Sequence, residues 1–244
     1  MIDKRITDDI GILILESPPQ NYLTDPEFIP LEELKEWIED NNLKALVITG
    51  SGRHFSGGAS LDSIYAMAEN DRQMESRMEK GKELLTCLQD LDIPVAAAIS
   101  GVCFGGGLEI ALACHLRICS ENALFAFPET NYGLMPGLGG TTRLSEQIPL
   151  KNSLQMILGG DMINAEEALL LKLVDAVIHN EEPLTYTLNF LKKITEGRQR
   201  KVINYVMKAL TNSKKLSVEE SMLEETRMFC DLARIESNRR KITN

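Results

Sequence analysis

The sequence predicts an α/β protein, and three features carry this prediction. Apolar runs of strand length, such as Ile93 to Ser100, alternate with segments of helical spacing, and glycine-rich turns separate the two. The chain opens with two β-rich runs, whereas its composition turns helical beyond Glu181. Strand, turn and helix units of uneven length that repeat along one chain are typical of the α/β class.

The first two strands form a predicted hairpin. They cover Ile2 to Thr7 and Ile10 to Leu15, and the Asp8-Asp9 pair between them resembles a tight turn. Ser17-Pro18-Pro19 then ends the second strand, because proline cannot donate to a sheet ladder.

A short amphipathic helix is predicted after Pro30, followed by a strand over Ala45 to Thr49. The apolar residues of this helix recur at helical spacing, and we interpret Trp37 among them as a packing residue. A long helix is predicted from Ile64 to Leu91, with methionines on its apolar face. Thioethers adapt to varied shapes, but core packing is the simpler interpretation of these methionines.

The stretch from Ser100 to Arg143 is the most informative part of the chain. Gly105-Gly106-Gly107 lies between an apolar strand and an apolar helix over Leu108 to Cys114, so the backbone turns tightly with uncovered N–H groups. A helix N-terminus offers unpaired donors and a positive dipole end, which suits an anion or an oxygen that becomes one. Glu109 falls in the first helical turn, and Glu129 follows twenty residues later in the chain.

The remaining elements follow the same alternation of strands, turns and helices. Predicted strands cover His115 to Ser120, Leu124 to Phe127 and Val174 to Ile178, and predicted helices begin at Gly139, Pro183, Lys201 and Ser217. The last of these helices has a capping box, Ser217-x-x-Glu220.

Composition and charge restrict the class of protein. The 244 residues are 43% hydrophobic and 25% charged, so one large or two small globular units are expected. Five cysteines without CxxC spacing predict neither a disulfide framework nor a metal site. A net charge of −10 disfavours nucleic acid and membrane partners, and the polar first residues predict a cytoplasmic protein.

Two motifs resemble the crotonase superfamily, whose best-known members are the enoyl-CoA hydratases. They are GGGLE at residues 105–109 and PETNYGLMPGLGGT at residues 128–141, within a resemblance that runs from Pro19 to about Leu232. The resemblance implies a crotonase-like spiral of ββα units over residues 1–190. It also implies a C-terminal helical region over 191–244 that packs across a trimer interface, giving a homotrimer or a hexamer of two trimers.

The resemblance also assigns site residues. Its Gly-Ala step places one oxyanion-hole donor at Ala59 and the other at Gly106, and it makes Glu109 and Glu129 the catalytic pair. Ser60 stands where relatives carry aspartate, and serine can also cap the following helix. The resemblance predicts substrate contacts at Asn21, Leu23, Ser56, Gly57, Gly58, Ser60, Leu61, Gly105, Pro136 and Gly137.

Simpler interpretations stand beside these assignments. Asn21 suits a turn and Leu23 a core position, while Gly139 and Gly140 are interpreted as turn formers only. A lone histidine such as His54 is more often structural than catalytic. In relatives the methionine-bearing segment also flanks the acyl tail, which gives those methionines a second possible role.

The leading hypothesis is an enoyl-CoA hydratase that acts on an acyl-CoA or acyl-carrier-protein thioester. Coenzyme A or a phosphopantetheine carrier is part of the substrate, so no cofactor and no metal are expected. Alternatives are an enoyl-CoA isomerase, a dehydratase or decarboxylase on a carrier-protein-bound polyketide intermediate, and a non-catalytic binding trimer. Coupled carboxylates share their titration, so the sequence leaves open which glutamate is the base and which the acid.

Overall fold

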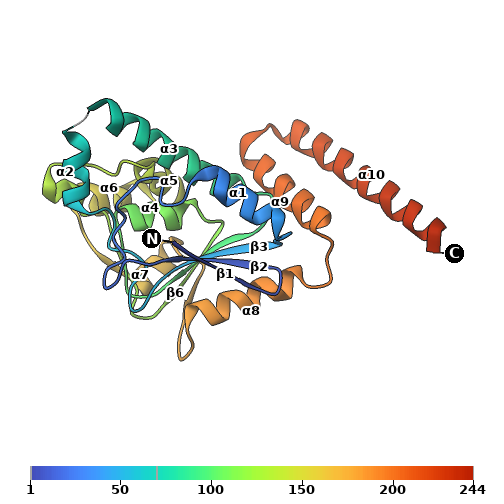
Figure 1. The fold of residues 1–244 in the computed structure, drawn as a ribbon, viewed down its shortest axis with the longest axis horizontal. Coiled ribbons are helices and arrows are strands. Elements are labelled where there is room, and N and C mark those ends of the chain that lie inside the picture. The colour runs from blue at the N-terminus through green and yellow to red at the C-terminus, as the bar shows by residue number, and fades with distance from the viewer. Residues whose placement is uncertain (1, 70, 244) are drawn as a thin grey trace.

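Two β-sheets and the helices that cover them build the protein. A computed structural model describes residues 2–69 and 71–243, with the side chains of residues 71, 72, 242 and 243 outside this description. The larger sheet has six strands in the order β1-β2-β3-β4-β6-β9, and the smaller has three in the order β5-β7-β8. The large sheet lies at the centre of Figure 1, with helices on both of its faces.

The large sheet begins with the predicted hairpin and continues with parallel strands. β1 (Ile2–Thr7) pairs antiparallel with β2 (Ile10–Leu15), in the register that places Ile2 opposite Leu15. The parallel strands are β3 (Ala45–Gly50), β4 (Val95–Ile99), β6 (Leu116–Ser120) and β9 (Ala176–Ile178).

The small sheet consists of short strands that lie between those of the large sheet in the chain. They are β5 (Val102–Phe104), β7 (Leu124–Ala126) and β8 (Ile163–Asn164). The chain therefore passes from the large sheet to the small one and back on successive turns, which confirms the predicted spiral of ββα units.

Seven α-helices and one 3-10 helix precede β9 in the described chain. They are α1 (Leu31–Asp40), α2 (Leu61–Ala68), α3 (Asp71–Asp90), α4 (Gly106–Ala113), the 3-10 helix η1 (Glu129–Tyr132), α5 (Gly140–Gln147), α6 (Leu150–Leu158) and α7 (Ala165–Leu170). The predicted long helix over 64–91 is wrong in its extent, because α2 already ends at Ala68. Ser60 starts α2 three residues earlier than expected by accepting a hydrogen bond from Ser63 N–H, which confirms its predicted capping role.

The two faces of the large sheet pack against different helices. Leu46 and Ile48 of β3 enter the main core, which also contains buried side chains of α1, α3 and α4. Val47 enters a second cluster on the opposite face, together with residues of α8 (Pro183–Thr195). Figure 1 shows α8 lying along this face. The predicted boundary after residue 190 falls inside α8.

The last two helices are α9 (Arg200–Lys215) and α10 (Val218–Thr243), and α10 extends away from the sheets in Figure 1. The predicted capping box is present, since Glu220 N–H donates to Ser217 Oγ and Ser217 N–H donates to Glu220 Oε2. Large apolar side chains remain exposed on these helices, among them Leu210, Met222 and Phe229. No helix in the described chain combines the length and the apolar character needed to cross a membrane.

Candidate active site

One cavity joins the four residues assigned to chemistry. It has a volume of about 1060 Å³ and is lined by Ala59, Gly106, Glu109 and Glu129. Its walls come from α2, α3, the start of α4, η1, and the loops at residues 22–26, 57–60 and 133–138. The fold thus brings these four residues, which lie apart in the chain, into a single site.

The backbone amides of Ala59 and Gly106 lie close together in this cavity. A β-carbon built on Gly106 would lie 3.7 Å from Ala59 N, and one built on Gly58 would lie 3.3 Å from Gly106 N. Leu23 N–H donates to Gly58 C=O and Ser60 N–H donates to Leu23 C=O, which holds the loop at Ala59 in an extended form. Within the described residues, neither the Ala59 nor the Gly106 amide donates to a protein acceptor. Two amides without a protein acceptor therefore lie near each other, and an oxyanion hole needs two such donors.

Glu109 is a buried carboxylate held by two backbone amides. Its side chain lies in the first turn of α4 with 2% of the residue exposed. Its Oε1 accepts hydrogen bonds of 2.7 Å from the N–H groups of Leu138 and Gly140. Burial raises the pKa of Glu109, while the two amides and the charges of Arg143 and Lys82 oppose this rise.

Glu129 has a different environment. It is the first residue of η1, and its Oε2 is buried without a hydrogen-bond partner in the described structure. Burial, with a smaller contribution from the negative charge of Glu109, raises the pKa of Glu129 to about 7. Gly105 has φ of +49° and a β-carbon there would lie 2.7 Å from Glu129 Oε1, so only glycine leaves room for this carboxyl group.

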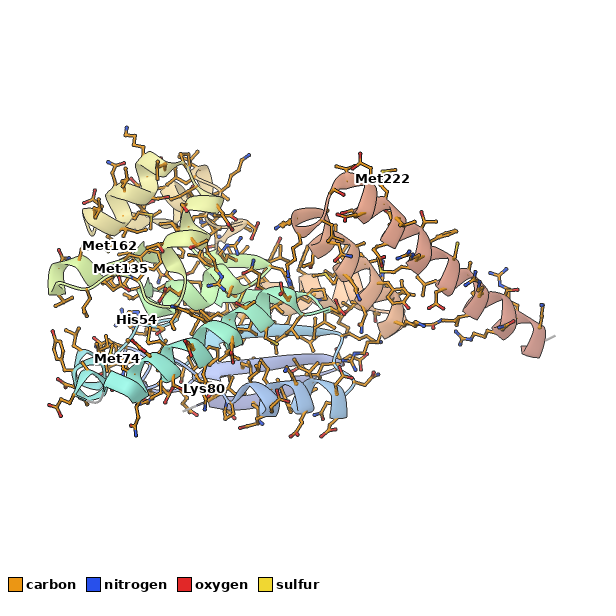
Figure 2. The ribbon with its side chains drawn as sticks, turned by 90° about the horizontal axis from the view of Figure 1, so that it is seen from above. His54, Met74, Lys80, Met135, Met162 and Met222 are labelled. Carbon is orange, nitrogen blue, oxygen red and sulfur yellow. The ribbon has the colours of Figure 1, made fainter. Side chains whose placement is uncertain are left out.

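Most of the predicted substrate contacts also line the cavity. These are Leu23, Gly57, Gly58, Ser60, Leu61, Gly105 and Gly137. Four methionines join them, since Met67, Met74, Met78 and Met135 all line the same space. Figure 2 shows Met74 on α3 and Met135 on the loop after η1 at the same end of the molecule. Met67 and Met78 thus both pack with the core and line the cavity, which agrees with the second role considered for the methionines of this segment.

Asn21, Ser56 and Pro136 are buried outside the described lining of the cavity. Asn21 has φ of +52° and is 1% exposed, and its Nδ2 donates to the carbonyl oxygens of Ser51 and His54 at 2.8 and 2.7 Å. Ser56 Oγ accepts from Gly58 N–H and donates to Asn21 C=O. Asn21 and Ser56 thus hold the loop that carries Ala59, and neither is part of the described lining where their predicted contact with substrate would be made.

His54 also has a structural position, as the simpler interpretation predicts. Its Nδ1 accepts a 3.1 Å hydrogen bond from Val102 N–H, and it does not line the cavity. Among the described residues, no group of three or more His, Cys, Asp or Glu side chains is placed to hold a metal ion.

The sequence interpretation missed the residues that hold Glu109. Gly140 was interpreted as a turn former only, yet its N–H donates to the carboxylate and a β-carbon there would lie 2.9 Å from Glu109 Cγ. Gly139 has φ of +96° and caps α5. The available signal was a glycine pair directly before a helix, because such a helix start presents free N–H groups.

Comparisons with known proteins show the family of this chain. The family model for enoyl-CoA hydratase/isomerase matches residues 6–243. A Bacillus subtilis protein named "Probable enoyl-CoA hydratase" is 30% identical over 232 residues, covering 93% of this chain and 88% of that protein.

The "Fatty acid oxidation complex subunit alpha" of Shewanella frigidimarina is 38% identical over 195 residues, or 78% of this chain. This chain spans only 27% of that longer protein. The crystal structure of an enoyl-CoA hydratase from Polaromonas sp. JS666 has a TM-score of 0.85 and 24% identity, covering 94% of this chain and 90% of that one. The latter comparison supports the fold.

Proposed function

This chain belongs to the enoyl-CoA hydratase/isomerase family, and we propose that it adds water syn across the double bond of a 2-enoyl thioester, or removes water in the reverse direction. The observation that carries the proposal is the single cavity that holds two free amides and two carboxyl groups. Hydration needs a polarised carbonyl, an activated water and a proton for C2, and these four groups supply all three.

The amides of Ala59 and Gly106 take the thioester oxygen in this proposal. Negative charge grows on that oxygen as the C3 carbon is attacked, so two fixed N–H donors stabilise the transition state more than the ground state. Gly106 is the first residue of α4, and the helix dipole adds to this stabilisation.

The environments of the two glutamates support a separate role for each. Glu109 acts as the base, because two amide donors stabilise its ionised form while it takes a proton from water. Glu129 acts as the acid, because a pKa of about 7 keeps much of it protonated near neutral pH. Oxygen then bonds to C3 as the Glu129 proton passes to C2, leaving Glu109 protonated and Glu129 ionised until solvent restores them.

The substrate carrier is coenzyme A or a phosphopantetheine arm on an acyl-carrier protein, and no further cofactor takes part. The methionine-lined part of the cavity suits an apolar acyl group, because thioethers adapt to its shape. A cytoplasmic location stays a prediction from the sequence.

We also propose a homotrimer, alone or paired as a hexamer. Support comes from apolar side chains left exposed on separate helices, such as Leu154 and Leu158 of α6 and Phe229 of α10. Sedimentation equilibrium of the purified chain would test this, and a monomer at micromolar concentration would contradict it.

A Δ3,Δ2-enoyl-CoA isomerase is the second candidate. Glu129 combines a raised pKa with a carboxyl oxygen that has no partner in the described structure, and a proton shuttle between two carbons needs both. The decisive experiment follows purified protein with 2-enoyl-CoA and 3-enoyl-CoA substrates of several chain lengths. Loss of the conjugated enoyl absorbance with incorporation of water oxygen supports hydration, whereas 3-enoyl to 2-enoyl conversion without it supports the isomerase. Absence of turnover on both substrate sets would defeat the enoyl-CoA proposals and favour a non-catalytic trimer.

A further inference from the structure

The turn that binds Glu109 consists of three consecutive peptide groups, of which the outer two donate to the carboxylate. The first supplies Leu138 N–H and the third supplies Gly140 N–H, both at 2.7 Å from Glu109 Oε1. The middle peptide joins Leu138 to Gly139. Its orientation fixes the angle between the two donors, because adjacent peptide planes share an α-carbon.

Arg143 holds the carbonyl groups on the other side of this turn. Its Nη1 donates to Leu138 C=O at 2.8 Å, and its backbone N–H donates to Gly139 C=O at 3.0 Å. The N–H side of the turn therefore faces Glu109, while its two following carbonyls are bound by one residue of α5. Arg143 is not among the described residues that line the cavity, so it acts on the site through this turn.

The guanidinium group has a fixed position. Arg143 Nε donates to Gln89 Oε1 of α3 at 3.0 Å, so the side chain bridges α3 and the turn. A β-carbon on Gly139 would lie 2.5 Å from Arg143 Nη1. The glycine at 139 thus gives the guanidinium the space it occupies.

Charge adds to this geometry. The positive charge of Arg143 favours the ionised form of Glu109, as does Lys82 of α3, while Glu109 in turn raises the pKa of Glu129. Burial lowers the pKa of Arg143, while the negative charges of Glu109, Glu146 and Asp90 oppose this change. Removing the positive charge at 143 would therefore make Glu109 harder to ionise.

We propose that Arg143 is a positioning residue for the base, holding the turn at residues 138–140 so that both amides meet Glu109 and keeping that carboxylate ionised. This inference rests on the proposed function, in which Glu109 removes a proton from water. It assigns to Arg143 a contribution to kcat without any contact with the substrate.

Three variants separate hydrogen bonding from charge. Arg143→Met removes both, and Arg143→Lys keeps the charge but loses the planar guanidinium group. Lys82→Gln removes a charge that, within the described residues, makes no hydrogen bond to the turn. We expect Arg143→Met to lower kcat by about 10- to 100-fold with KM changed little, as for a misplaced catalytic group. The acidic limb of the pH–rate profile of Arg143→Met should move to higher pH, because the ionised form of Glu109 is disfavoured in this variant. Arg143→Lys should keep the wild-type limb with a partial loss of kcat, and Lys82→Gln should shift the limb slightly with kcat at its plateau unchanged.

A titration of Glu109 that needs no turnover makes the test independent of the reaction. Carbon-13 NMR of labelled glutamate carboxyl groups, with Glu109→Gln as the assignment control, gives the pKa of Glu109 in wild type and in each variant. A higher pKa of Glu109 in Arg143→Met, in a variant still folded by circular dichroism, supports the inference. An unchanged pKa and acidic limb, with only the melting temperature lowered, overturns it. If wild type hydrates no enoyl thioester, the proposed function fails, while the NMR titration still decides the role of Arg143.

Discussion

The carboxylate of Glu109 and the amide of Gly140 lie 2.7 Å apart although 31 positions separate them in the chain. Glu109 belongs to the first turn of α4, and Gly140 is the first residue of α5. One carboxylate therefore lies at the N-termini of two helices, whose dipoles both favour its negative charge. This arrangement offsets part of the cost of burying the group.

Replacing either glutamate by glutamine should abolish most of the hydration activity. We expect kcat to fall by about 10²- to 10⁴-fold in Glu109→Gln and in Glu129→Gln, with a small change in KM, because proton transfer is lost and shape is kept. The double variant should be little worse than either single one, since the two groups act together. Initial rates on crotonyl-CoA measure this, with Glu83→Gln on the exposed face of α3 as the control. Near-wild-type turnover in both single variants would contradict the assigned pair.

The pH dependence of kcat should be bell-shaped. The acidic limb reports ionisation of Glu109, and the rate should fall again as pH rises through about 7, where Glu129 loses its proton. In Glu109→Gln the pKa of Glu129 should decrease, because the neighbouring negative charge is gone. Carboxyl NMR follows this change directly, and an unchanged pKa would show that the two groups do not interact.

Gly106→Pro should remove one oxyanion donor. We expect kcat to fall by about 10²- to 10³-fold, since proline has no N–H and the first position of a helix otherwise accepts it. Gly106→Ala is the matched control, because it keeps the N–H and its β-carbon comes no closer than 3.2 Å to Leu23 Cδ1. Equal kcat values for the two variants would exclude this amide from the oxyanion hole.

Asn21→Ala should destabilise the fold more than it affects substrate binding. The variant leaves the buried carbonyls of Ser51 and His54 without their donor, which costs about 1–3 kcal/mol. Urea unfolding measures this loss, and we expect KM to change by less than roughly threefold, or about 0.7 kcal/mol. A large rise in KM at unchanged stability would return Asn21 to the substrate contacts.

Glu129 should make the folded state less stable as pH rises. Its folded pKa of about 7 exceeds the ordinary 4.5, so the folded state holds more protons between these values and stability falls with increasing pH. Glu129→Gln should therefore gain stability relative to wild type at pH 8 but not at pH 4. The gain should be about 1–2 kcal/mol, after allowance for solvent screening of a partly exposed group. Parallel urea curves at the two pH values provide the measurement, and a gain of the same size at both would contradict the raised pKa.

Much of the fold and the centre of the site could be predicted from the sequence. The hairpin at residues 2–15 and helix α8 match the expected ranges, because alternation, proline and charge define them locally. The carboxylates of Glu109 and Glu129 could be assigned because their glycine and proline contexts carry the family resemblance.

The rest depends on groups or contacts that the sequence does not display. Backbone donors such as Leu138 N–H are not marked by the residue type, and only the folded turn directs them at Glu109. Asn21 carries the polar amide expected of a substrate contact, yet long-range contacts with residues 51–55 determine where it lies. The strands β5 and β8 are too short for a periodic pattern, so β7 is the one strand of the small sheet that was predicted from the residues.

Every described residue that lines the cavity lies between Tyr22 and Leu138, while α6 to α10 contribute none of the described lining. Substitutions in those later helices can therefore alter the apolar side chains that they expose while the reacting groups stay in place. The outer surface of α6 to α10 can thus change without any change in the described lining of the cavity.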